Sequence, residues 1–418
     1  MFLSQSFKDF LSLFFSNIFQ KILGLVRELV IAFFLGSSIL YANFLLLRVV
    51  ADFFSQITAG NALKANLLPK FTKIYNKFNH VSLVKVFNFS KKYSFYLFFF
   101  SQIIQTAVIF YLDLEDNYLF FLASLILSFC ICFNFINTIF LTVMQAKGFF
   151  LRYSYASVTN SLIFTILVYP LVSFFSFIGL AISRLLGILT MSILFVNPMR
   201  KERNGEEINL YASDFNFSTL ILGNFANIII ISSRFVAGAD GSNSITFFMY
   251  AVVILNALLT SVITNISTIL LRKISIKKNT QMMKYSLFVS LALGSFMILL
   301  LYFFSFDITK FMYFRGAFTI EDVQQTSLYL YQLCYSFLFL FVATILFQPF
   351  LSLPITETKD IRLKLSNIFL IVLLISSVVI LFSDFLAREK ALFVMYMSSI
   401  SAVFLALFSY KKYQLYEK

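Results

Sequence analysis

Long apolar segments alternate with short charged connections along the whole chain. A helix of about 20 apolar residues crosses the hydrocarbon core of a bilayer and satisfies its own backbone hydrogen bonds there. The pattern therefore predicts an all-α polytopic membrane protein with about twelve transmembrane spans. The spans lie near residues 10–34, 38–62, 92–112, 118–146, 153–172, 175–197, 215–237, 244–271, 284–305, 321–348, 364–383 and 390–410.

The charge of the connections alternates from one side of the predicted spans to the other. Lysine and arginine gather in residues 63–91, 147–152, 198–212, 272–284 and 411–418. The intervening connections are neutral, acidic or mixed, as in Asp113–Asp116 and around Asp240. Cytoplasmic loops carry the excess of basic residues in membrane proteins, so both termini and the basic connections are expected in the cytoplasm.

The spans divide into two sets of six, separated by the charged stretch Arg200–Glu207. We expect an N-terminal six-helix bundle of residues 1–200, a cytoplasmic linker of residues 201–212 and a C-terminal bundle of residues 213–418. Six spans per half leave both halves in the same orientation, which is typical of a parallel repeat about the membrane normal. Leu67–Lys70 and Leu270–Lys273 are expected to end the second and eighth spans at matching positions.

The first span carries a polar stripe within its apolar sequence. Its members are Asn17, Gln20, Lys21, Gly24, Arg27 and Glu28. At 100° per residue they share an arc of roughly 120° on a helix. A charge at membrane depth is costly unless it faces water or a partner. We interpret the stripe as one wall of a water-filled cleft, and pairing with a neighbouring helix is the alternative.

Further polar residues lie at depth in other spans. Arg48, Asp52, Ser55 and Gln56 share one face of the second span, where Arg48 can pair with Asp52 four residues on. The others are Arg184 in span six, Asn224, Asn227 and Arg234 in span seven, and Asn256 in span eight. Positive charge is in surplus, which suits an anionic ligand held by a guanidinium fork. Helix packing or snorkelling is the alternative for Arg184 and Arg234.

Composition excludes a soluble protein and indicates no metal chemistry. Hydrophobic residues make up 60% of the chain, which contains 58 phenylalanines and no tryptophan. The formal charge of +14 reports membrane topology and not nucleic-acid binding. Cys130 and Cys132 do not share a helix face, so no metal site or disulfide is expected. No cofactor is expected either, and the N-terminal segment, which lacks a small-residue cleavage site, is expected to be retained.

Four short motifs make the sequence similar to a known family. They are Lys21-Ile-Leu-Gly-Leu-Val-Arg27-Glu28, Ile31-Ala-Phe-Phe-Leu-Gly36, Pro69 and Arg315-Gly-Ala-Phe-Thr-Ile-Glu-Asp322. The chain resembles the MurJ/MviN lipid flippases of the multidrug/oligosaccharidyl-lipid/polysaccharide (MOP) exporter superfamily, to which the Wzx-type polysaccharide flippases are related. The resemblance implies two six-helix bundles that form a V around a central cavity. It also implies a monomeric transporter, not an enzyme, in the bacterial cytoplasmic membrane.

The charged site of that family is only partly present here. Arg27 matches a cavity arginine of the family, and Lys21 keeps the charge of another. The family's charges are absent at Ala42, at Ser55–Gln56, at Gly60–Ala62 and at Ala251–Asn256. The glycan is therefore left open between lipid II and an O-antigen, capsule or other polyprenyl-linked unit.

We predict a flippase that moves a polyprenyl-pyrophosphate-linked saccharide across the membrane by alternating access, with membrane lipids around it. Its predicted substrate-binding residues are Lys21, Gly24, Arg27, Arg48, Asp52, Gln56, Asn61, Asn224, Asn227, Arg234 and Asn256. One alternative is an exporter of small molecules coupled to Na⁺ or H⁺ through Glu28 or Asp52. The other is a degenerate paralogue that does not transport. Short outer loops disfavour a membrane glycosyltransferase.

Overall fold

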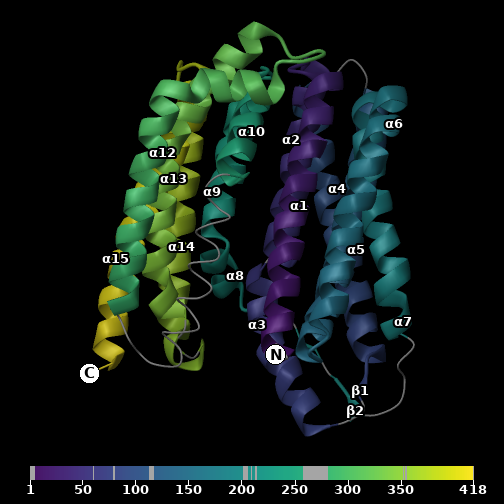
Figure 1. Ribbon diagram of the computed structural model, residues 1–418. Coiled ribbons are helices and arrows are strands. Elements are labelled where there is room, and N and C mark those ends of the chain that lie inside the picture. The colour runs from purple at the N-terminus through teal and green to yellow at the C-terminus, as the bar shows by residue number, and fades with distance from the viewer. Residues whose placement is uncertain are drawn as a thin grey trace. The chain divides into compact units, whose positions relative to one another are not determined.

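Helices make up nearly all of the computed structural model (Figure 1). The structure describes residues 5–59, 61–78, 81–112, 117–200, 206–208, 210–211, 214–257, 281–351, 353 and 355–417. The chain forms two compact units. Unit 1 comprises Met1–Leu35 and Phe44–Leu220, and unit 2 comprises Gly36–Asn43 and Ile221–Lys418.

Unit 1 is a bundle of long apolar helices with short elements at one end. In chain order it contains α1 (Gln5–Leu35), most of α2 (Ile39–Ala59), α3 (Asn61–Lys77), β1 (Val81–Ser82), α4 (Val84–Leu112), α5 (Asn117–Ala146), α6 (Phe150–Met191), the π-helical η1 (Ser192–Val196), α7 (Asn197–Arg200) and β2 (Glu206–Glu207). Helix α1 packs along α6, and α5 packs against α3, α4 and α6. Strands β1 and β2 pair in parallel, with Val81 opposite Glu206.

Unit 2 is organised around one buried helix, α13. Its helices are α9 (Phe225–Gly238), α10 (Ser244–Leu255), α12 (Gln281–Tyr313), α13 (Ile320–Leu351), α14 (Ile355–Leu381) and α15 (Ala387–Glu417), and α8 (Phe217–Gly223) crosses the unit boundary. Helix α13 packs against α10, α12 and α15, and α15 also packs against α9 and α14 (Figure 1). Thr319 and Asp322 begin α13 as a reciprocal cap, because each backbone N–H donates to the other's side chain.

Helix α6 is a hairpin of two membrane-spanning arms. Ser176 has φ 51° and ψ −134°, which interrupts the helix. A Cβ placed on Gly187 would lie 2.8 Å from the carbonyl oxygen of Asn160. In a straight helix these two residues would be about 40 Å apart, so the chain must fold back at Ser176. The fifth and sixth predicted spans are the two arms.

The predicted set of about twelve spans is confirmed. Eight helices of the described part are long and apolar enough to cross a membrane, or nine if the bent pair α8 and α9 forms one span. That count treats α6 as one helix and omits α1 and α10. The last residues of the predicted eighth span, 258–271, and its expected end at Leu270–Lys273 lie outside the described residues.

One local prediction is wrong. Residues 63–91 are not a loop, because α3 and the start of α4 lie there and α2 ends at Ala59. Leu63, Leu67 and Phe71 recur every four residues and are buried, so α3 is an amphipathic helix, and Pro69 lies within it instead of closing span two. The predicted seventh span, 215–237, corresponds to α8 and α9, which meet at a 75° bend at Gly223 and Asn224.

Candidate functional site

Five charged side chains of unit 1 come together on three membrane-spanning helices. Helix α1 contributes Arg27 and Glu28, α2 contributes Arg48 and Asp52, and the second arm of α6 contributes Arg184. We call these residues the unit 1 charge cluster. Arg48 and Asp52 are one helical turn apart, so α2 presents both on the same face.

Asp52 and Arg184 form the tightest contact in the cluster. The Arg184 guanidinium donates through Nη2 to Asp52 Oδ1 at 2.9 Å, which joins α2 to α6. On the other side of the carboxylate, Arg48 Nε lies 3.6 Å from Asp52 Oδ2. Asp52 is therefore held between two arginines, but only Arg184 is at hydrogen-bonding distance.

Glu28 makes longer ion-pair contacts. Its Oε1 lies 3.7 Å from Arg27 Nε and 4.0 Å from Arg48 Nη2. Both distances exceed those of hydrogen bonds, so neither arginine is locked onto this carboxylate. The Glu28 side chain is 3% exposed, whereas those of Arg27 and Arg48 are 18% and 11% exposed.

The cluster has an excess of positive charge in an environment of reduced polarity. Three guanidinium groups and two carboxylates give these five side chains a formal charge of +1. Charges interact more strongly at low dielectric than in water. The arrangement therefore favours an anion with several acceptor oxygens, which can engage more than one guanidinium.

The position of Arg27 depends on the packing of α1 against α6. Its guanidinium carbon lies 4.2 Å from the ring centre of Phe164, a favourable stacking geometry for arginine. Thr165 donates a hydrogen bond to the Leu23 carbonyl and so connects the same two helices. A Cβ on Gly24 would lie 3.9 Å from Arg27 Nη2, so a small side chain fits beside the guanidinium.

The structure brings together only part of the predicted site. Arg27, Arg48 and Asp52 belong to the charge cluster, with Gly24 beside Arg27. Lys21 is half-buried on α1, and Gln56 is half-buried on α2, one turn after Asp52. Asn61 is the first residue of α3, and its side chain lies outside the described part.

The remaining predicted residues belong to unit 2. Asn224 is buried at the bend before α9, whereas Asn227 on α9 is exposed. Arg234 is buried, and its Nη1 lies 3.1 Å from the sulfur of Met249. Asn256 is half-buried at the C-terminal end of α10.

Glu28 and Arg184 belong to the cluster but were not among the predicted binding residues. The charge of each at mid-span was visible in the sequence. What the sequence lacked was the pairing, because the contact between Arg184 and Asp52 joins residues 132 positions apart.

Unit 2 contains, besides Arg234, the buried arginine Arg362 of α14, which was not predicted either. It is 1% exposed. Its Nε donates to the Thr358 hydroxyl at 2.8 Å and its Nη2 to the Leu353 carbonyl at 2.9 Å, with longer contacts to the carbonyls of Phe350 and Leu351. These carbonyls lie at and just after the end of α13, where backbone acceptors lack helical partners. Arg362 therefore caps α13.

No family model and no curated protein matches the sequence. Solved structures do match. The lipid II flippase MurJ in an inward closed conformation superposes with a TM-score of 0.74 at 22% identity, over 96% of this chain and 87% of that one.

More distant transporters share the same architecture. An inward-facing multidrug resistance MATE transporter of the MOP superfamily gives a TM-score of 0.66 at 12% identity, over 95% of both chains. A MOP-superfamily transporter from Pyrococcus furiosus gives 0.60 at 12% identity, over 98% of this chain and 96% of that one. The chain is therefore a multi-pass membrane protein with the MurJ-like fold of the MOP superfamily.

Proposed function

We propose that this protein is a flippase for a polyprenyl-pyrophosphate-linked saccharide. The observation that carries the proposal is the unit 1 charge cluster, a net positive group of five side chains on three membrane-spanning helices. A buried surplus of positive charge is costly in a membrane and is typical of a substrate pathway. The fold shared with MurJ and the MOP transporters supports the same conclusion.

The two carboxylates of the cluster have different roles in this proposal. Asp52 holds Arg184 by a hydrogen bond and keeps α2 on α6. Glu28 contacts Arg27 and Arg48 only at ion-pair distances, so phosphate oxygens can replace it around these two arginines. Lys21, two turns before Arg27 on α1, contacts the same anion through its ammonium group. The saccharide contacts amide side chains of the predicted site, such as Gln56. Transport then follows alternating access.

The membrane orientation forms part of the proposal. We propose a monomer in the bacterial cytoplasmic membrane, with both termini and the basic connections in the cytoplasm. Asn76 is exposed on α3, and Asn117 begins α5. Single cysteines at these positions, with the native cysteines replaced, should react with an impermeant maleimide from opposite sides. Reaction from the same side contradicts this orientation.

An ion-coupled exporter is the second candidate. One observation favours it, since Glu28 Oε2 is buried and accepts no hydrogen bond from any described residue. An exporter that titrates Glu28 loses transport in Glu28→Gln. The flippase proposal expects Glu28→Gln to retain surface glycan, because the positive surplus of the cluster persists.

Complementation of a flippase-null strain tests the flippase directly, with surface glycan as the readout and immunoblots to match membrane levels. Arg27→Ala should abolish surface glycan, and Arg27→Lys should restore only part of it because a point charge replaces the guanidinium fork. Lys21→Arg should be tolerated and Lys21→Ala should not. Lys92→Ala, at an exposed lysine of α4, serves as the control. Wild-type glycan in Arg27→Ala at matched protein level contradicts the proposal.

A further inference from the structure

An aromatic ring, that of Phe164 in the first arm of α6, lies against the guanidinium group of Arg27. The guanidinium carbon is 4.2 Å from the ring centre, and Phe164 is 9% exposed. Stacking covers a face of a guanidinium group, whereas the N–H donors of the group point outward in its plane. Phe164 therefore holds Arg27 without using the donors that bind an anion.

Glu28 competes with a bound anion for Arg27. Its Oε1 lies 3.7 Å from Arg27 Nε, so a shift of about 1 Å would bring these atoms to hydrogen-bonding distance. The Glu28 side chain is 3% exposed, and little water would weaken such a pair. The ring of Phe164 supports the guanidinium in the position where the pair stays open.

Phe164 is itself held by the second arm of α6. A Cβ on Gly187 would lie 3.2 Å from the Phe164 Cβ and 2.8 Å from the Asn160 carbonyl oxygen, so the two arms pack closely at this level. Small residues allow helix backbones to approach in this way. Gly187 lies less than one turn after Arg184, another arginine of the charge cluster. The same close contact therefore fixes the ring and the turn that carries Arg184.

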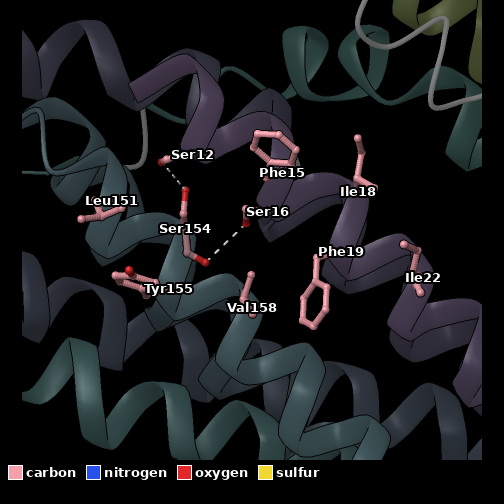
Figure 2. Close-up of a pocket in the computed structure, with 10 residues that line it drawn as sticks. All are labelled: Ser12, Phe15, Ser16, Ile18, Phe19, Ile22, Leu151, Ser154, Tyr155 and Val158. Atoms are coloured by element: carbon pink, nitrogen blue, oxygen red, sulfur yellow. Dashed lines mark hydrogen bonds between the residues drawn. The ribbon is translucent and has the colours of Figure 1, made fainter. Parts of the chain in front are cut away.

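Hydrogen bonds hold α1 in place along the first arm. Ser16 donates to the Ser154 carbonyl at 3.4 Å, and the hydroxyls of Ser12 and Ser154 are 3.0 Å apart, as the dashed lines in Figure 2 show. Further along both helices, Thr165 donates to the Leu23 carbonyl at 3.3 Å. These contacts fix the register of the two helices and thereby bring the arginine of α1 onto the ring of α6.

We propose that Phe164 is a positioning residue that keeps Arg27 available for the pyrophosphate of the substrate. Its ring holds the guanidinium at ion-pair distance from Glu28 and prevents a closed pair. Without the ring, Arg27 turns to Glu28, and an anion has to break a hydrogen-bonded pair before it binds. Gly187 acts through Phe164. This inference rests on the proposed flippase function and adds to it a residue that sets the affinity for the anion.

The affinity for a polyprenyl pyrophosphate tests the role of Phe164. The readout is the lipid concentration that halves the reaction of Gly24→Cys with a water-soluble thiosulfonate, in a protein whose native cysteines are replaced. Phe164→Leu should raise this concentration about three- to tenfold, the range expected for a buried cation–π contact. Phe177→Leu is the matched control and should leave it unchanged, because Phe177 is also a buried phenylalanine of α6 but packs on Phe44 and Phe120.

Removal of the competing carboxylate separates positioning from folding. Glu28→Gln in the Phe164→Leu protein should return the concentration to near the wild-type value, because the carboxylate that competes for Arg27 is gone. Gly187→Ala should raise the concentration with the same rescue, and it replaces Phe164→Leu if that variant does not purify as a monodisperse protein.

An unchanged concentration in Phe164→Leu overturns the proposal, and so does a rise that Glu28→Gln does not reverse or that Phe177→Leu equals. A protein with Phe164 intact that the lipid does not protect at all contradicts the flippase function itself. The two failures are therefore distinguishable.

Discussion

Arg362 of unit 2 and Arg27 of unit 1 show how differently a membrane protein uses the same side chain. Arg362 of unit 2 is 1% exposed and donates to a hydroxyl and to carbonyls at the end of α13. Arg27 of unit 1 has an 18% exposed side chain and lies over a phenylalanine ring, 3.7 Å from a carboxylate oxygen. The first is enclosed by neutral acceptors at hydrogen-bonding distance. The second belongs to a charged group with long contacts.

The difference separates a structural charge from a proposed ligand-binding charge. Neutral carbonyls at a helix end satisfy a guanidinium without needing any ligand. A cluster with surplus positive charge and long ion pairs gains most when an anion enters it. Substitution of Arg362 should therefore change stability, and substitution of Arg27 should change transport.

The largest expected effect on stability is that of Arg362→Met. It leaves the Leu353 carbonyl and the Thr358 hydroxyl without their donor, which should lower the free energy of unfolding by about 2–5 kcal/mol. Unfolding in detergent can be followed with a thiol-reactive dye, because Cys130 and Cys334 are buried and free. Arg362→Lys should recover part of the loss. A melting temperature unchanged in Arg362→Met shows that the cap does not stabilise α13.

An intermediate effect is expected for the pair of Asp52 and Arg184. Each single change, Asp52→Asn or Arg184→Gln, removes one of the two opposite charges of this contact. A double-mutant cycle of melting curves should give a coupling energy of about 1–3 kcal/mol. A coupling near zero means that the contact does not hold α2 on α6, and Arg184 is then better placed in the ligand-binding group with Arg27.

The smallest effect on stability is expected for Arg27→Ala. It removes the stacking on Phe164 and a long ion pair, while Arg48 stays near Glu28. Its melting temperature should fall by less than half the shift of Arg362→Met, although transport is lost. A fall as large as that of Arg362→Met removes the distinction between the two arginines.

Periodicity and loop charge predicted most of the fold, because the bilayer imposes helix length and the basic connections follow topology. Features that depend on tertiary contacts were not predicted. Helix α3 was taken for a loop because its lysines masked the buried positions Leu63, Leu67 and Phe71. The bend at Asn224 has no charge or proline to mark it.

The candidate site was predicted in the same uneven way. The stripe on α1 follows from helix geometry alone, so Arg27 could be identified from its spacing. The partners of a charged residue within the membrane could not be identified from spacing, because they lie on distant segments of the chain. Arg184 meets Asp52 across 132 positions, and Arg362 meets carbonyls that the side-chain sequence does not reveal. The sequence therefore identified charged residues within the predicted spans. It did not distinguish Arg362, which caps a helix, from the arginines of the unit 1 charge cluster.

The central claim is that Arg27 helps to hold an anionic lipid head group, and a reporter beside it tests this most directly. Gly24→Cys places a thiol next to Arg27 Nη2, in a background where Cys130, Cys132 and Cys334 are replaced by alanine. The rate of reaction with a water-soluble thiosulfonate is measured with and without a polyprenyl pyrophosphate, and with inorganic pyrophosphate for the head group alone. The account predicts that the lipid slows the reaction severalfold and that Arg27→Ala abolishes the protection. Equal protection with and without Arg27, or no protection in either protein, contradicts it.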